Sequence, residues 1–214
     1  DNAQQQKILL QEHLSKVSSK ILSSSFRFNL TPDASKDPQK PLYSIGATAE
    51  EFFAMQVLCR NVKKLFKISM SSRHEILSQL KMLLREDKSR YYIIRTDVCH
   101  CFESIPHDKL FEYLEGNNLL DVKSKSLLRG LIRNEFETKN LRPLVSISQT
   151  GIPRGCAISS LLSEFYLSKI DEVLRCTLPG IVFLARYVDD IIIVVHPDLD
   201  DEHQWSLNDY VKAL

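Results

Sequence analysis

The sequence has no long hydrophobic run. Its longest apolar segments, such as residues 191–195, are far shorter than the roughly 20 residues that a membrane-spanning helix needs. The N-terminus also lacks the basic and then apolar pattern of a secretion signal. We therefore expect neither membrane insertion nor secretion, and we predict a cytoplasmic protein. Because the first residue is not Met, we interpret the chain as an excised or processed piece.

A cysteine pattern typical of disulfides or of zinc is also missing. The number of cysteines is odd, they are scattered, and a chain of 214 residues can bury a core without covalent cross-links. Cys99 and Cys101 have no second pair at the spacing of a zinc site. We expect five reduced thiols, at Cys59, Cys99, Cys101, Cys156 and Cys176.

The net charge of +1 hides an uneven distribution of charge along the chain. Residues 59–90 contain nine Lys or Arg against three Asp or Glu, so this segment carries +6 and the remainder carries −5. A basic segment of this size can hold a polyanion. The sequence therefore predicts a basic lobe followed by a mildly acidic one.

Hydrophobic periodicity predicts a chain of mixed helices and strands. Ser72 and Glu75 form a capping-box pattern, and Pro106 and Gly116 are typical of the two ends of a helix. Three prolines favour a surface loop at residues 29–41. Helices are predicted at residues 1–22, 50–67, from 73 onward, 106–115, 121–136 and 159–176, and extended segments at 91–98, 143–148, 181–187 and 191–195.

The order of these elements favours an α+β fold. The strands at 181–187 and 191–195 have only residues 188–190 between them, so we expect a hairpin. A small antiparallel sheet with helices over one face fits this order, and the helical region before residue 91 would form a separate lobe.

Two adjacent aspartates occupy the turn of the apolar hairpin. Asp189 and Asp190 have an ordinary interpretation as a solvated turn, because turns favour polar residues. Asp97, at the end of another predicted strand, supports a functional interpretation, because neighbouring strands would bring it beside the turn. Three carboxylates at one sheet edge can hold two divalent ions about 4 Å apart, the arrangement used in phosphoryl transfer.

Three segments resemble motifs of the reverse-transcriptase family. In the first, Asp97 is followed five residues later by the aromatic Phe102. In the second, a Gly-Ile-Pro-Arg-Gly turn opens a helix, where the family usually has Pro-Gln-Gly. The third reads Arg-Tyr-Val-Asp-Asp. The segments follow the family's order and lie at residues 95–105, 151–171 and 186–190, with 92 residues from Asp97 to Asp189.

The resemblance implies the fingers and palm of a right-hand polymerase. It assigns residues 1–90 to a helical fingers region and residues 91–214 to the palm, with a fingers insertion at about 117–150. The family's thumb is expected to be missing, because the chain ends at Leu214. A further domain or a partner chain would then supply it.

The implied activity is RNA-directed DNA synthesis on a nucleic acid template and primer. A primer hydroxyl would attack the α-phosphorus of a dNTP with two Mg²⁺ ions, or Mn²⁺, as cofactors. The resemblance makes Asp97 and Asp189 metal ligands and Asp190 the third carboxylate. The backbone carbonyl of Val98 would add a further metal ligand.

Other residues are implied in nucleotide binding. Phe102 lies where the family has the aromatic that blocks a ribose 2′-hydroxyl, which favours dNTP over NTP; core packing is the alternative. Arg154 and Gly155 match the turn that contacts the nucleotide and template, with a purely structural turn as the alternative. Because the family usually has Gln at position 154, nucleotide selection is expected to differ here.

Basic residues of the first lobe match the fingers in position. Arg73 would meet the triphosphate or the template backbone, and Tyr187 would contact the primer end or pack in the core. Basic residues at helical spacing would join Arg73, with a solvated helix face as the alternative: Arg60, Lys63, Lys64 and Lys67.

Details of the motifs favour one subgroup. The Ser-Arg-His-Glu-Ile-Leu segment at 72–77, the Ile-Pro-Arg-Gly turn and the Leu-Ser-Glu-Phe-Tyr-Leu helix most resemble bacterial abortive-infection and defence-associated enzymes, with group II intron and retron enzymes as relatives. The localisation implied is the bacterial cytoplasm. Two alternatives remain: an untemplated or protein-primed DNA polymerase of the same defence group, and an inactive polymerase-like module that binds nucleic acid.

Overall fold

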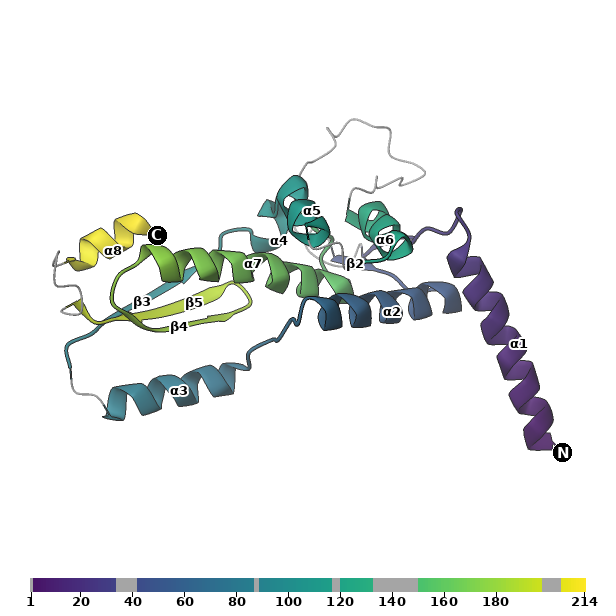
Figure 1. The fold of residues 1–214 in the computed structure, drawn as a ribbon, viewed down its shortest axis with the longest axis horizontal. Helices are drawn as coiled ribbons and strands as arrows, with labels where there is room; N and C mark the ends of the chain where they lie inside the picture. Colours follow the sequence, from purple (N-terminus) through teal and green to yellow (C-terminus); the bar gives the residue numbers. More distant parts are fainter. Residues whose placement is uncertain (1, 34–41, 87–88, 117–119, 133–149, 198–204) are drawn as a thin grey trace. The chain divides into compact units, whose positions relative to one another are not determined.

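The computed structural model describes residues 2–33, 42–86, 89–116, 120–132, 150–197 and 205–214 (Figure 1). The chain divides into two compact units, each built from two separate stretches of sequence. The first contains residues 1–67 and 105–161, and the second contains residues 68–104 and 162–214. Within the described ranges, each helix is too short or too polar to cross a bilayer.

The first unit is mainly helical. Its core consists of apolar side chains that recur at helical spacing, such as Leu58 and Val62, which are 1% and 0% exposed. Its helices are α1 (Asn2–Leu22), α2 (Ala49–Leu65), α5 (His107–Glu115) and α6 (Val122–Ile132), together with the first turn of α7 (Ala157–Thr177).

A two-stranded ribbon also belongs to the first unit. Strands β1 (Thr31–Asp33) and β2 (Leu42–Ser44) pair antiparallel, and the hydroxyls of Thr31 and Ser44 lie 2.7 Å apart. The loop predicted at 29–41 is therefore wrong for residues 31–33, because an edge strand tolerates a proline such as Pro32. The rest of that predicted loop lies outside the described residues, apart from residues 29 and 30.

The second unit contains a three-stranded antiparallel sheet in the order β3-β5-β4. Its strands are β3 (Tyr92–Asp97), β4 (Ile181–Tyr187) and β5 (Asp190–Val195), with the apolar β5 in the centre. Ile193, Val194 and Val195 on β5 are all 0% exposed. The predicted hairpin is confirmed, but its turn is one residue shorter than predicted because Asp190 pairs with Tyr187 and begins β5.

Helices accompany this sheet. The part of α7 that belongs to this unit runs along it in Figure 1, and α3 (Arg73–Glu86) lies beside the edge strand β4. The short helix α4 (Cys101–Ser104) follows β3, and α8 (Leu207–Ala213) places Tyr210 in the core, where its hydroxyl donates to Pro179 O at 3.1 Å. The predicted α+β arrangement with a small antiparallel sheet is therefore confirmed.

Helix starts agree with the local sequence signals. The predicted capping box at the start of α3 is present, since Glu75 N donates to Ser72 Oγ at 3.1 Å and Ser72 N donates to Glu75 Oε2 at 3.2 Å. Pro106 is the N-cap of α5, one residue before the position predicted. The predicted helix at 121–136 is described as far as Ile132, and the predicted strand at 143–148 lies outside the described residues.

Candidate active site

The pairing of β3 with β5 brings the three candidate aspartates to one end of the second unit's sheet. Asp97, the last residue of β3, is the direct Cα partner of Asp190, the first residue of β5. The next residue, Val98, donates its N–H to Asp189 O at 3.0 Å. This end of the sheet, where β4 turns into β5, is visible in Figure 1.

The turn between β4 and β5 has an unusual backbone. It consists of Val188 and Asp189, and Val188 has φ +60°. Two-residue hairpin turns require a positive φ at their first position, which glycine adopts without strain and a β-branched residue does not. A conformation of this kind costs about 1–3 kcal/mol and persists only where surrounding contacts fix it. The turn that carries Asp189 is therefore strained.

Asp190 is held by two arginines. Arg95 Nη2 donates to Asp190 Oδ1 at 3.0 Å, and Arg73 Nη2 lies 3.8 Å from Asp190 Oδ2. The Arg73 guanidinium also lies 4.9 Å from the centre of the Tyr187 ring, in a cation–π contact. The hydrogen bond and the charge of Asp190, with a smaller contribution from Asp97, raise the pKa of Arg95. We call Asp190, Arg95 and Arg73 the Asp190 cluster.

The structure places Arg73, Tyr187 and the three predicted aspartates around one turn. It adds Arg95, to which the sequence assigned no role. Arg95 lies two residues before Asp97 on β3, and residues at this spacing point to the same face of a sheet. An arginine at this spacing from a candidate metal-binding aspartate is the signal that could have found it.

The residue types at this edge suit a hard divalent cation, because carboxylate and carbonyl oxygens are the ligands that Mg²⁺ prefers. The side chains are not gathered into a cage, however. In the described ranges, no three His, Cys, Asp or Glu side chains are arranged to hold a metal ion. Asp190 is paired with arginine instead. The oxygen atoms at this edge are of the type that binds a divalent metal ion. Asp190 must release its arginine partners before it can become a metal ligand.

Phe102 follows the Asp97 strand on the short helix α4 and is partly buried. Its neighbour Cys101 is 3% exposed and lies 3.4 Å from Ser163 Oγ of α7. Burial raises the pKa of the Cys101 thiol, which agrees with the prediction of a reduced thiol. Phe102 therefore lies in the same unit as the aspartates, and the buried Cys101 anchors the helix that carries it.

Arg154 and Gly155 belong to the first unit. Tyr43 N donates to Arg154 O at 2.7 Å, so this turn pairs with β2. Gly155 has φ +89°, and a Cβ at this position would lie 2.6 Å from Tyr43 O. Contact with the chain's own backbone is therefore sufficient to require glycine here. The sequence could not indicate this contact, because Tyr43 is 112 residues away.

The three basic residues of α2 are exposed and follow the predicted stripe: Arg60, Lys63 and Lys64. Lys67 does not belong to it, because α2 ends at Leu65 and Lys67 has φ +50°. The predicted helix at 50–67 was therefore too long at its C-terminal end.

Comparison with known proteins decides the family. Residues 40–214 match the model of the reverse transcriptase (RNA-dependent DNA polymerase) family. The chain belongs to the reverse transcriptase family. Membership supports an RNA-directed DNA polymerase, which is a nucleotidyltransferase, and enzymes of this family generally use divalent metal ions.

Relatives of this reverse-transcriptase chain come from introns and from telomerase. It is 26% identical over 182 residues to an uncharacterized 91 kDa protein in the cob intron of Schizosaccharomyces pombe, covering 74% of this chain and 21% of that protein. It is 29% identical over 110 residues to the telomerase reverse transcriptase of Euplotes aediculatus, covering 40% of this chain and 11% of that protein. The chain thus spans about a fifth of the first relative and less of the second.

Solved telomerase structures are also similar to this reverse-transcriptase chain. Apo telomerase from Candida tropicalis, truncated from its C-terminal domain, has a TM-score of 0.48 and 15% identity, over 91% of this chain and 46% of that one. Telomerase from Candida albicans in complex with a fragment of telomeric RNA has a TM-score of 0.42 and 13% identity, over 88% and 42% of the two chains.

Proposed function

We propose that this chain carries the catalytic carboxylates of an RNA-directed DNA polymerase that joins a dNTP to a primer hydroxyl by a two-metal mechanism. The observation that carries the proposal is the direct pairing of Asp97 with Asp190, beside the bond from Val98 N–H to Asp189 O. This geometry occurs in a chain whose residues 40–214 match the reverse-transcriptase family. It brings the residues of two separated motifs to one sheet edge.

Asp97, Asp189 and the Val98 carbonyl would hold the divalent ions, and Asp190 would join them on leaving Arg95. Bound Mg²⁺ or Mn²⁺ would activate the attacking hydroxyl and stabilise the charge on the departing pyrophosphate. The chain's own contribution is to fix these oxygens at one edge before substrate binds. Arg95 and Arg73 keep the charge of Asp190 balanced until that exchange.

Further residues would contact the nucleic acid and the nucleotide. We assign Arg73 to a phosphate and Tyr187 to the primer end, since both lie at the turn that carries Asp189. Arg154 and Gly155 would contact the nucleotide and template, on the evidence of their motif alone. We propose that a further domain or a partner chain supplies the thumb, since the chain spans only a fraction of its relatives.

Phe102 would act as the aromatic that excludes a ribose 2′-hydroxyl. Its replacement by alanine should therefore raise the ratio of rNTP to dNTP incorporation, measured in single-nucleotide extension assays. Phe111, a buried phenylalanine of the first unit, supplies the control as Phe111→Leu. A core-packing role for Phe102 predicts instead a loss of stability with an unchanged ratio.

Primer extension by the full-length protein with Mg²⁺ tests the proposed activity. The arms contain a primed RNA template, a primed DNA template and no template. Extension on RNA that is lost in Asp97→Asn supports the proposal. Extension without template would favour the untemplated or protein-primed alternative, and nucleic acid binding without extension in any arm would favour the inactive module.

The proposed biological role is bacterial antiphage defence. It rests on the resemblance of the Ile152-Pro153-Arg154-Gly155 turn and its neighbouring segments to defence-associated enzymes, whereas the relatives described above are intron and telomerase proteins. The efficiency of phage plating on cells that express the wild-type protein, compared with cells that express Asp97→Asn, tests the defence role. Equal plating on both would contradict a defence role while leaving the polymerase proposal intact.

A further inference from the structure

Arg186 lies one residue before the end of β4, and its side chain is only 3% exposed. It sits between two acidic side chains of α7. Its Nη1 and Nη2 donate to the two carboxylate oxygens of Glu164, both at 2.8 Å. Its Nε and Nη2 donate to Asp171, at 2.9 to 3.1 Å. We call Arg186, Glu164 and Asp171 the Arg186 cluster.

The spacing of the two acids explains why both reach one guanidinium. Glu164 and Asp171 are seven residues apart, close to two helical turns, so they lie on the same face of α7. Burial acts to lower the pKa of Arg186, but the hydrogen bonds and charges of the two carboxylates outweigh it, and the pKa of Arg186 is raised. The arginine therefore stays charged in the core of the unit.

One donor of Arg186 is directed to the turn instead of an acid. A guanidinium has five N–H groups, and the bonds to Glu164 and Asp171 occupy four of them. The fifth, on Nη1, donates to the backbone carbonyl of Val188 at 2.9 Å. No other side chain could make this set of bonds, because a lysine ammonium has only three donors.

Val188 is the strained residue of the turn, with φ +60°. Its carbonyl is bonded to Arg186, and the carbonyl of the next residue, Asp189, accepts from Val98 N–H on β3. The turn is thus fixed on two sides, by a buried side chain and by the strand that carries Asp97. These two carbonyls belong to the peptide planes on either side of Asp189 Cα, and those planes set the direction of the Asp189 side chain.

We propose that Arg186, fixed by Glu164 and Asp171, is a positioning residue that holds the Val188-Asp189 turn in the geometry needed for catalysis. The proposal deepens the proposed polymerase function and rests on it. Arg186 touches neither substrate nor metal in this role. It acts by holding the backbone from which Asp189 projects.

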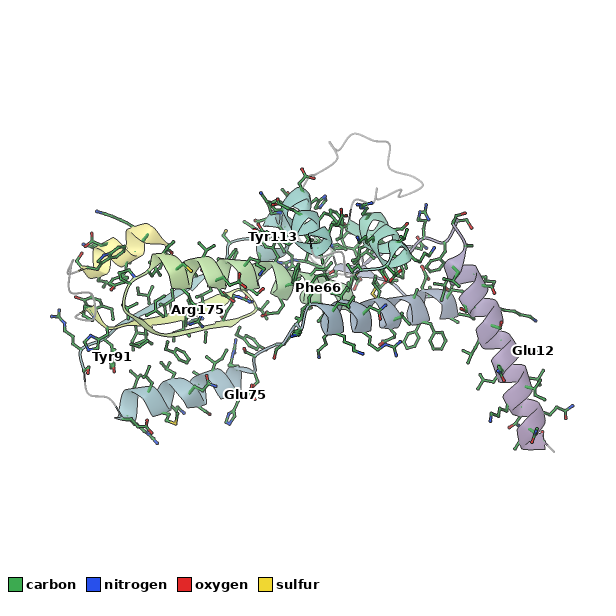
Figure 2. The ribbon with its side chains drawn as sticks, viewed as in Figure 1. Glu12, Phe66, Glu75, Tyr91, Tyr113 and Arg175 are labelled. Atoms are coloured by element: carbon green, nitrogen blue, oxygen red, sulfur yellow. The ribbon has the colours of Figure 1, made fainter. Side chains whose placement is uncertain are left out.

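The test compares Arg186→Lys with a matched control, Arg175→Lys, in the full-length protein. Arg175 projects from α7 in the same unit (Figure 2) and donates to a β4 carbonyl outside the turn, Leu184 O at 2.9 Å. Hydrogen exchange of the Val98 amide reports the turn without requiring activity, because that amide is bonded to Asp189 O. Primer extension gives kcat and the KM for dNTP.

We expect Arg186→Lys to increase exchange at Val98 by at least about tenfold and to lower kcat by about 10- to 100-fold. The KM for dNTP should change by less than about twofold, since a displaced carboxylate weakens the transition state more than the ground state. Arg175→Lys should leave all three quantities near their wild-type values. The unfolding temperature of each variant separates these effects from a general loss of fold.

Unchanged exchange and kcat in a folded Arg186→Lys protein would overturn the proposal, as would equal effects in Arg175→Lys. If Arg186→Lys does not fold, the test uses Glu164→Gln, in which Asp171 still pairs with Arg186. Faster exchange at Val98 and a lower kcat in Glu164→Gln would support the proposal, and wild-type values of both would contradict it. If the wild-type protein extends no primer, the polymerase function fails, and the exchange at Val98 still decides whether Arg186 holds the turn.

Discussion

The Arg186 cluster and the Asp190 cluster flank the same turn and use the same chemical groups, but they differ in exposure. Arg186 is 3% exposed and is shared by two acids, whereas Arg95 and Arg73 are 75% and 68% exposed and share one acid. Removing a partner from a buried pair leaves an uncompensated charge, while water and salt replace a partner at an exposed pair. The buried cluster therefore fixes the backbone, and the exposed cluster can exchange its cation.

This difference separates two roles that carboxylates have within the second unit. Glu164 and Asp171 serve the structure, since within the described residues their side chains accept hydrogen bonds from Arg186 alone. Asp190 is presented at the edge with replaceable partners. A divalent cation displaces an arginine more easily from an exposed carboxylate than from one bonded to the buried Arg186, whose five N–H groups are all used.

The largest expected effect comes from replacing an aspartate by asparagine, either Asp189 in the turn or Asp171 in the Arg186 cluster. Asp189→Asn should lower nucleotide incorporation by about 1,000-fold, because a metal ligand contributes several kcal/mol to the transition state. Its unfolding temperature should remain that of the wild type, because Asp189 is exposed. Asp171→Asn should show the opposite balance, with a loss of about 1–3 kcal/mol in the free energy of unfolding and a smaller loss of activity. Wild-type incorporation by folded Asp189→Asn would contradict the assignment of the metal site.

A second prediction compares the arginines by stability. Arg186→Met should lower the free energy of unfolding by about 3–5 kcal/mol, measured by denaturant titration, because the partly buried Glu164 and Asp171 would be left without a cation. Arg95→Met should leave the midpoint nearly unchanged, since an exposed pair contributes little. Equal effects of the two substitutions would remove the distinction between the clusters.

The smallest expected effect concerns metal affinity. Arg95→Gln releases Asp190 from its nearest cation, so the Mg²⁺ concentration for half-maximal extension should fall by about two- to fivefold at low salt. The difference from wild type should shrink as ionic strength rises, because salt screens exposed charges. Arg90→Gln is the control, since Arg90 contacts Tyr92 and lies outside the Asp190 cluster. A higher Mg²⁺ requirement in Arg95→Gln would show that Arg95 assists metal binding instead of competing with it.

Much of the fold could be predicted from local patterns. The helices α1, α2, α3 and α7, the strand before Asp97 and the late hairpin all appear where periodicity and capping signals indicated. Two of the errors lie at boundaries decided by strand pairing. Residues 31–33 form a strand because Leu42–Ser44 lies beside them, and Asp190 joins β5 because Tyr187 and Asp97 both pair with it.

The sequence predicted which residues belong to the candidate site better than it predicted the contacts between them. Asp97, Asp189 and Asp190 meet at one sheet edge as their positions at strand ends indicated. The sequence assigned no role to Arg95, and although it left a structural turn as the alternative for Gly155, it did not indicate the close approach of Tyr43 O to that position. Both depend on contacts between residues far apart in the sequence.

The sequence by itself determined the family, the order of the motifs and the placement of the aspartates at strand ends, because these follow from local residue patterns. Only the tertiary structure decided which arginine faces which acid. The partners of Arg186 are 15 and 22 residues away and the partner of Arg95 is 95 residues away, so charge pattern alone could not pair them. Burial then separates the two clusters, since the same ion pair fixes a backbone in the core and stays exchangeable at the surface.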